Sequence, residues 1–185
     1  MSIVNPTCPT DCTYTLQIVD ADICNPDLAF GQINTIYLAA RNAADLTDWT
    51  DQTEWDARLS NTGTDADDIR YLFGIGEKPA AESAEYKISK GRTIYGKRTH
   101  TITFEVEDTG VNNYNFIRYL QCNGFYKLWY QHDKWLYGGN DGIEDVSIKV
   151  DEVIPQSDEE FLKFIFTITW KAKFSPERTE LNPVA

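Results

Sequence analysis

The chain is short of the residues that most enzymes and membrane proteins depend on. It contains two histidines, His100 and His132, and one methionine. No stretch approaches the roughly 18 apolar residues of a membrane-spanning helix. The N-terminus has neither the basic start nor the apolar core of a secretory signal peptide. These absences predict a protein without a membrane span that folds in a cytoplasm.

Positive charge is also scarce. The chain has 17 basic and 29 acidic residues, a formal net charge of −12. Such a charge opposes the phosphate neutralisation on which tight nucleic-acid binding depends, so a protein that grips DNA or RNA is disfavoured. The acidity has two open interpretations. It gives colloidal solubility to an abundant protein, or it forms a surface that a nucleic acid passes without adhering.

Candidates for catalysis are few. A nucleophilic site requires a serine or cysteine beside a base, but His100 lies within an alternating strand pattern and His132–Asp133 has the composition of a turn. No G-x-S-x-G motif is present. The acidic residues are numerous enough for a glycosidase pair, yet nothing singles one out. We predict no enzymatic activity and no catalytic residue.

Metal and cofactor ligands are equally sparse. Cys8, Cys12, Cys24 and Cys122 are sufficient in number for a zinc ion, but paired spacing is missing and no histidine lies near them. We interpret them as buried free thiols, with a disulfide among them as the alternative. The acidic clusters lack the ligand order of an EF-hand, and the Gly-Ile-Gly at 74–76 lacks a phosphate-binding fingerprint. We therefore predict no metal and no cofactor.

Aromatic residues, by contrast, make up 13% of the chain and fall in alternating stretches typical of β-strands. The last of these stretches, residues 161–174, has the clearest alternation. Its fourteen residues exceed the usual strand length of about five or six, so we expect part of it to project and to need a partner along its edge. The predicted strands are Thr13–Val19, Ile33–Ala40, residues 86–107 with a glycine-containing turn, Phe125–Gln131, residues 135–139, residues 146–154 and residues 161–174.

Two segments have helical features instead. Residues 108–124 have apolar residues at helical spacing, with Asp108 or Thr109 as N-cap. A short helix is predicted around 50–59, with Thr50 or Asp51 as N-cap. Residues 69–80 are predicted to be a turn-rich connection because they contain two glycines and a proline. The predicted fold is mainly β, a largely antiparallel β-sandwich or partial barrel with one flanking helix.

The expected organisation is a single domain with two extensions. Residues 1–12 form an extended N-terminal arm, residues 13–174 the β-rich domain and residues 175–185 a C-terminal tail. The sequence GRTIYGKR at 91–98 is a basic patch in an acidic protein, which indicates a contact with an acidic neighbour. The candidate subunit-interface residues are Arg92, Lys97 and Arg98 in that patch, and Pro176 and Arg178 in the tail.

Three runs of the sequence carry a resemblance to a known group of proteins. They are INTIYLAARNAADLTDWTDQTEWDARLS, ISKGRTIYGKRTHTITFEVEDTGVNNYNFIRYLQCNGFYKLWY and ITWKAKFSPER. Together they resemble virion structural proteins of tailed bacteriophages, where strand, capped helix and strand recur in this order in the tail-tube type. The resemblance implies a β-sandwich or partial barrel whose copies join around a ring, with arms that bridge to the next layer.

The resemblance also implies partners and a location. Copies of the chain and other virion proteins are the partners, DNA is only a passing cargo, and the protein resides in the virion after synthesis in a bacterial cytoplasm. The expected function is that of a non-catalytic tail-tube or head-to-tail connector subunit, whose acidic residues line the DNA path while Arg92, Lys97 and Arg98 lie away from it. A capsid decoration protein fits the same features. From another class, a carbohydrate-binding module stays open, because exposed Trp and Tyr stack on sugars.

Overall fold

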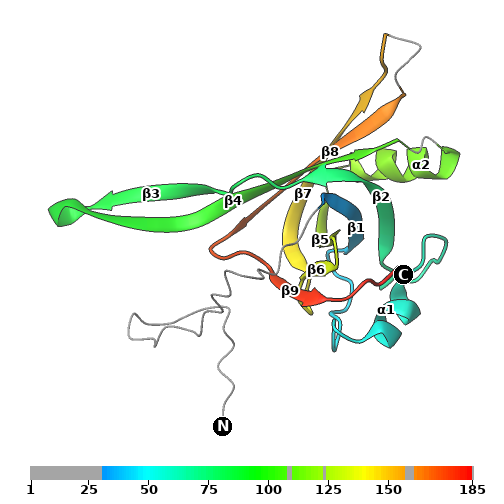
Figure 1. Ribbon diagram of the computed structural model, residues 1–185, viewed down its shortest axis with the longest axis horizontal. Coiled ribbons are helices and arrows are strands. Elements are labelled where there is room, and N and C mark those ends of the chain that lie inside the picture. Colours follow the sequence, from blue (N-terminus) through cyan, green and yellow to red (C-terminus); the bar gives the residue numbers. More distant parts are fainter. Residues whose placement is uncertain (1–30, 108–109, 123, 157–160, 185) are drawn as a thin grey trace, which may run out of the picture.

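The computed structural model describes residues 31–107, 110–122, 124–156 and 161–184. The predicted fold class is confirmed: the described chain is mainly antiparallel β-sheet with two α-helices (Figure 1). The predicted N-terminal arm and the predicted strand Thr13–Val19 lie outside the described residues. The elements in chain order are β1 (Ile33–Ala40), α1 (Gln52–Arg58), β2 (Arg70–Glu77), β3 (Glu82–Ile88), the 3-10 turn η1 (Ser89–Gly91), β4 (Arg92–Val106), α2 (Val111–Leu120), β5 (Phe125–His132), β6 (Trp135–Gly138), β7 (Ile143–Val153), β8 (Lys163–Ala172) and β9 (Glu177–Glu180).

Six of the strands close into a barrel. Their order is β1-β2-β4-β8-β7-β5, and β5 pairs back onto β1 along its whole length. β6 continues the sheet beside the last residues of β5, and β9 pairs with β6. The expected C-terminal tail therefore contributes a strand that packs on the rest of the domain. Closure pairs both edges of each barrel strand along the barrel itself.

The barrel interior is filled by alternate residues of its strands. Successive side chains of a strand point to opposite faces, so every second residue enters the core. The alternation predicted for β4 and for the inner part of β8 is confirmed by burial. The inward residues of this pair are His100, Ile102, Phe104 and Val106 on β4, and Phe164, Phe166, Ile168 and Trp170 on β8.

β2 differs from the prediction. Residues 70–77 form a strand of the barrel, so the predicted turn-rich connection at 69–80 is wrong. Gly74 and Gly76 lie against the ring of Phe104, and a Cβ built on either glycine would come within 2.8 Å and 2.6 Å of that ring. A Cβ on Gly74 would also overlap the carbonyl oxygen of Glu105. The glycines therefore make room for a neighbouring ring and backbone inside a continuous strand.

Both predicted helices are present. α2 is the longer of the two described helices, and its N-cap is Gly110, not the predicted Asp108 or Thr109. Its buried residues Ile117 and Leu120 belong to the core cluster of the barrel. At its C-terminal end, Gln121 donates a hydrogen bond of 3.1 Å to the carbonyl of Val150, which ties the helix to β7. No helix in the described ranges has the length and apolar character needed to cross a membrane.

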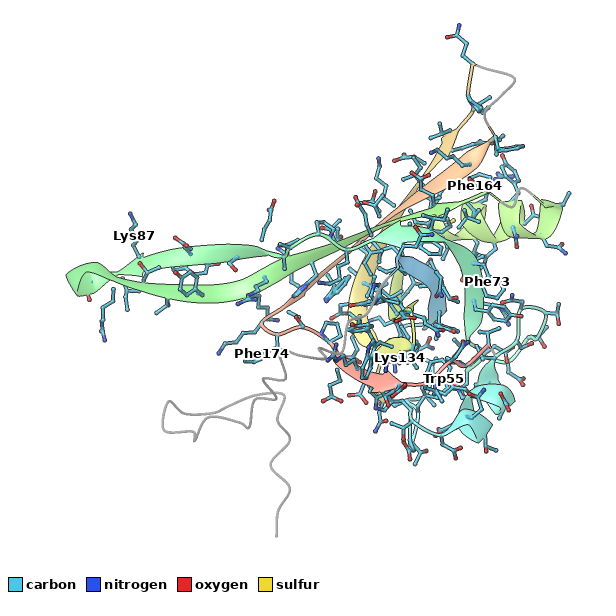
Figure 2. All side chains as sticks on the ribbon, viewed as in Figure 1. Trp55, Phe73, Lys87, Lys134, Phe164 and Phe174 are labelled. Atoms are coloured by element: carbon cyan, nitrogen blue, oxygen red, sulfur yellow. The ribbon has the colours of Figure 1, made fainter. Side chains whose placement is uncertain are left out.

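α1 organises a second apolar cluster outside the barrel. Its N-cap is Asp51, as predicted, and the carboxylate accepts a hydrogen bond from the backbone of Thr53. Trp55, which Figure 2 labels beside the barrel, is fully buried. Its ring centroid lies 5.4 Å from that of Tyr37 on β1 and 5.6 Å from that of Trp129 on β5, in an edge-on contact. This cluster attaches residues 43–69 to the outer face of β1 and β5.

The strand lengths also differ from the prediction. β8 spans ten residues, because Phe161 and Phe174 lie outside its ladder. The longest described strand is β4, with 15 residues. The strand that extends furthest beyond the barrel is thus β4 and not the predicted C-terminal strand.

Candidate functional site

A two-stranded arm, residues 82–98, projects from the barrel. β3 pairs with the first half of β4, from Glu82 opposite Thr99 to Ile88 opposite Arg92. The turn between them contains Gly91 at a φ of 70°, a conformation that glycine adopts without strain. β8 pairs with β4 only from Arg98 onward, so within the described chain residues 92–97 pair with β3 alone. Figure 1 shows the arm extending far from the barrel.

One face of the arm is apolar. Tyr86 lies opposite Ile94, and Ile88 follows two residues later on the same strand, so the three side chains share a face. The ring of Tyr86 covers Gly96, where a Cβ would lie only 2.6 Å from Cε2. Tyr86, Ile88 and Ile94 are 56%, 37% and 50% exposed. A patch of this kind on a ribbon without a core beneath it is typical of a protein interface.

The arm is also basic. It contains five basic and two acidic residues, a formal charge of +3, so the rest of the chain carries −15. Arg92 lies opposite Ile88, on the same face as the apolar residues, while Lys87 and the 62% exposed Tyr95 lie on the other face. Figure 2 shows the side chain of Lys87 standing out from the distal part of the arm.

The five predicted interface residues fall in two places. Arg92, Lys97 and Arg98 are exposed residues of β4 and lie on the arm. Of the three, only Arg92 lies next to the turn. Pro176 and Lys97 line one groove of about 890 Å³ at the base of the arm. Arg178 lies on β9, where its guanidinium carbon is 4.3 Å from the ring centroid of Trp135. The positive charge of Arg178 therefore interacts with an aromatic ring of its own domain.

A second hairpin leaves the barrel at the end of β7 and the start of β8. β7 pairs with β5 only as far as Ser147, whereas its pairing with β8 continues to Val153 opposite Lys163. Beyond the ladder, Ile154 and Phe161 are 73% and 77% exposed. We call residues 153–156 and 161–163, which lie beyond the pairing of β8 with β4, the tip hairpin. Figure 1 shows it leaving the barrel in a different direction from the arm.

The sequence pointed to only part of these surfaces. The basic residues of the arm stand out in an acidic chain, but Tyr86, Ile88 and Ile94 were not singled out. Their signal is the presence of large apolar residues between those basic ones, in a stretch that pairs locally across a glycine-containing turn. Ile154 and Phe161 flank a segment that begins with a proline, and nothing in their spacing separates exposed from buried positions.

His132 and Asp133 form part of a tight turn. Asp133 has a φ of 54° in the two-residue connection between β5 and β6. His132 Nε2 lies 3.0 Å from the carbonyl oxygen of Gly31, to which it donates when that nitrogen carries the proton. The expectation that the pair is not catalytic stays a prediction.

The described residues contain one cysteine. Cys122 is an exposed free thiol, at variance with the predicted burial, and its Sγ lies 3.8 Å from the carbonyl oxygen of Arg118. Cys8, Cys12 and Cys24 lie outside the described residues. Within the described ranges, no three histidine, cysteine, aspartate or glutamate side chains gather as a metal site.

A groove of about 410 Å³ lies between the C-terminal end of α2 and the ends of β1, β2 and β5. It is lined by the aromatic residues Phe116, Tyr119 and Phe125 and by charged side chains that include Arg70. Tyr119 is 68% exposed, whereas the ring of Phe125 is partly covered by Arg41, whose guanidinium carbon lies 5.3 Å from its centroid. Tyr119 is thus the available aromatic platform in this groove.

Where β4 leaves the barrel, a buried histidine has unsatisfied polar atoms. His100 stacks on Trp170 with ring centroids 5.1 Å apart, and neither its ring nitrogens nor the indole nitrogen have a hydrogen-bond partner among the described residues. Burial, reinforced by the charge of Lys78, lowers the pKa of His100 below its usual value of 6.5, and the nearby backbone of Ala172, which is not within hydrogen-bonding geometry, opposes this shift only in part. The folded protein therefore favours the neutral imidazole.

This burial predicts a pH effect. Below pH 6.5 the unfolded chain binds a proton at His100 that the folded chain resists, so stability falls as the pH decreases from 7 through 6.5 toward the folded pKa. In His100→Phe, which keeps a ring against Trp170, the loss of melting temperature between pH 7 and pH 5 should be smaller than in the wild type. Equal losses in both proteins would show that His100 does not titrate differently in the two states.

No protein-family model, curated protein or solved structure matches this chain.

Proposed function

We propose that this protein is a non-catalytic structural subunit that assembles with copies of itself. The observation that carries the proposal is the arm, which exposes Tyr86, Ile88 and Ile94 on one face of a two-stranded ribbon. An isolated two-stranded hairpin is only marginally stable in water, because it has no core to cover its apolar side chains. An arm of this length is therefore stabilised when a neighbour covers it.

The arm also carries unpaired strand edges. β3 pairs only with β4, and residues 92–97 of β4 pair only with β3 within the described chain, so backbone groups along both sides of the ribbon are open for strand addition. Such edges promote association unless they are covered. The barrel from which the arm projects is closed. Association is thereby directed to the projections and not to the barrel wall.

Among possible assemblies, we propose a ring or tube of the phage tail-tube or head-to-tail connector type. The sequence resemblance to virion structural proteins of tailed bacteriophages supports this choice, and the net charge of −12 suits a wall that DNA must slide past. In such a conduit, acidic side chains lie on the inner wall, while Arg92, Lys97 and Arg98 lie at subunit contacts. A capsid decoration protein is the alternative within the same class.

Light scattering of the purified full chain, combined with electron microscopy, tests this proposal. We expect particles larger than a monomer, and rings or tubes for a tail or connector protein. Tyr86→Ser combined with Ile94→Ser should shift the distribution toward monomer, because it removes the apolar face of the arm while leaving the buried core intact. Phe73→Ser is the matched control, since Phe73 is 60% exposed but lies on β2.

Two results would overturn parts of the proposal. A monodisperse monomer at every protein concentration would remove the self-assembling subunit. An assembly without a pore, or with a positively lined pore, would remove the DNA conduit and leave the decoration protein. Circular dichroism of the Tyr86/Ile94 variant should match the wild type, because neither side chain belongs to a core cluster.

A second candidate function is favoured by the groove beside α2. The exposed ring of Tyr119 and the charged side chains near it resemble the combination of platform and hydrogen-bonding groups that binds sugars. If the protein is a carbohydrate-binding module, a glycan array should show specific binding by a monomer. Tyr119→Ala should abolish that binding, and Tyr95→Ala, which changes a similarly exposed tyrosine on the arm, should not.

A further inference from the structure

We infer that the arms of two copies join along β3, edge to edge and antiparallel, so that the two ribbons form one four-stranded sheet. This inference rests on the proposed self-assembly and names a contact through which it occurs. Within the described chain, β3 pairs with β4 alone, so its outer edge presents unpaired backbone groups. Such an edge is a template for another strand. Because the arm extends far from the barrel (Figure 1), an antiparallel contact places the two barrels at opposite ends of the joined arms.

The alternation of side chains along β3 limits the registers that this contact can take. Tyr86 and Ile88 lie on the apolar face of the arm, and Glu85 and Lys87 lie on the opposite face. A shift by a single residue sets the apolar side chains of one copy beside the charged side chains of the other. Only registers that differ by two residues in their pairing keep like faces together.

Charge selects one register among these. A contact centred on Glu85 sets that carboxylate opposite its own copy, and a contact centred on Lys87 does the same with two ammonium groups. A contact centred on Ala84 sets Tyr86 opposite Glu82. The contact centred on Tyr86 instead sets Glu85 of each copy opposite Lys87 of the other. Of these four registers, it alone pairs opposite charges, and its two-fold symmetry forms that pair twice.

The side chains that would form these pairs are available. Glu85 and Lys87 are exposed, and neither forms an ion pair with another described residue of its own chain. On the other face of the contact, the two Tyr86 rings become cross-strand neighbours and Ile88 lies opposite Ala84. Opposite charges and aromatic rings directly across an antiparallel ladder stabilise the pairing of its strands.

The same register makes the apolar face continuous across both arms. Ile94 lies opposite Tyr86 within each arm, so a row of four large side chains crosses the joined sheet, with the two Tyr86 rings at its centre. In the single chain Tyr86 and Ile94 are 56% and 50% exposed. A two-stranded hairpin is marginal by itself, whereas additional strands with a shared apolar face stabilise it. The contact therefore supplies what the isolated arm lacks.

The other edge of the arm is less suited to a second copy of itself. Residues 92–97 of β4 include Arg92 and Lys97 and no acidic residue, so two copies of this edge carry only like charges. A two-fold contact through β3 closes on two copies. The edge of β4 therefore stays open for contacts of another kind in a larger assembly.

Exchanging the charges of Glu85 and Lys87 tests the contact. In a pair of identical copies, Glu85→Lys sets lysine opposite lysine and Lys87→Glu sets glutamate opposite glutamate, twice in each contact. Analytical ultracentrifugation should show that each variant associates with itself at least about tenfold more weakly than the wild type. A chain with both substitutions should associate as the wild type does, because the charges are again opposite. Within the arm, Tyr95 and Thr93 lie opposite these positions, so no like charges face each other across the ribbon.

Mixing the two single variants gives a sharper result. In a mixed pair, both lysines of the Glu85→Lys chain lie opposite the two glutamates of the Lys87→Glu chain. An equimolar mixture should therefore form a heterodimer about as tight as the wild-type dimer. If the arm bound a different surface of the next copy, mixing would rescue nothing, because neither substitution changes that surface. A mixture that associates as weakly as its components would overturn the inference.

Controls separate this inference from the proposed function. Asp56→Lys on α1 and Lys171→Glu on β8 make the same changes of charge at exposed positions outside the arm. Each should associate within about twofold of the wild type, and mixing them should change nothing. If the arm variants associate as well as the wild type, the contact through β3 is wrong and self-assembly stands. Wild-type chains that never associate would instead remove the proposed function itself.

Discussion

Replacing Trp55 with alanine is expected to lower the free energy of unfolding by about 3–5 kcal/mol, the usual loss for a buried large aromatic side chain. Trp55 is fully buried between Tyr37 and Trp129, and its indole nitrogen donates a hydrogen bond of 2.8 Å to the carbonyl of Trp49. The substitution removes the centre of the cluster that attaches α1 to the barrel. Urea denaturation followed by circular dichroism measures the change.

Two further variants help to interpret the loss of unfolding free energy in Trp55→Ala. Trp55→Phe keeps a ring in the cluster but loses the hydrogen bond, so it should destabilise the protein less than alanine does. Phe161→Ala removes a side chain that is 77% exposed and should change the free energy of unfolding by less than about 0.5 kcal/mol. A loss below about 1 kcal/mol for Trp55→Ala would show that the cluster does not hold α1 in place.

Gly74→Val is expected to destabilise the protein for the opposite reason, because it adds volume where none is free. A Cβ at this position lies 2.8 Å from the ring of Phe104 and overlaps the carbonyl oxygen of Glu105. Overpacking of a core commonly costs about 1–3 kcal/mol, and contact with backbone leaves little room for relaxation. We expect the high end of that range or a protein recovered only in aggregates.

A second-site change distinguishes overpacking from loss of chain flexibility. Phe104→Ala opens space beside Gly74, so the double variant should be less destabilised than the sum of the two single variants. Phe73→Val is the control and should be nearly neutral, because it introduces a valine at the exposed position of β2 that directly precedes Gly74. Simple additivity in the double variant would contradict the packing described for Gly74 and Phe104.

The parts of the fold predicted from the sequence are those in which local pattern and packing agree. Alternation in residues 100–106 coincides with burial in β4, and the spacing of Ile117 and Leu120 coincides with the buried face of α2. β2 was not predicted from the sequence, because Gly74 and Gly76 indicate a turn when only their sequence neighbours are considered. Its role next to Phe104 depends on a ring 30 residues away in the sequence, and no local pattern reports such a contact.

The candidate site was predicted only through its charge. Arg92, Lys97 and Arg98 stand out in an acidic chain, and the structure places them on the arm. The apolar face was missed for a physical reason. The pairing of β3 with β4 shifts register between Ser83 and Glu85, which adds one residue to β4, so counting back from Phe104 assigns Ile94 to the wrong face. An alternating sequence also does not reveal whether the strand packs on a hydrophobic core.

The closure of the barrel has a consequence for the order of events during synthesis. β1 pairs with β5, which follows about 90 residues later, and β4 pairs with β8, whose last residue is Ala172. At roughly 5–20 residues per second, the early strands wait several seconds on the ribosome for their partners. β3 and the first half of β4 pair locally and need no such wait. In a nascent chain the two strands of the arm therefore meet first, and the barrel closes only after β8 has been synthesised and has paired with β4 and β7.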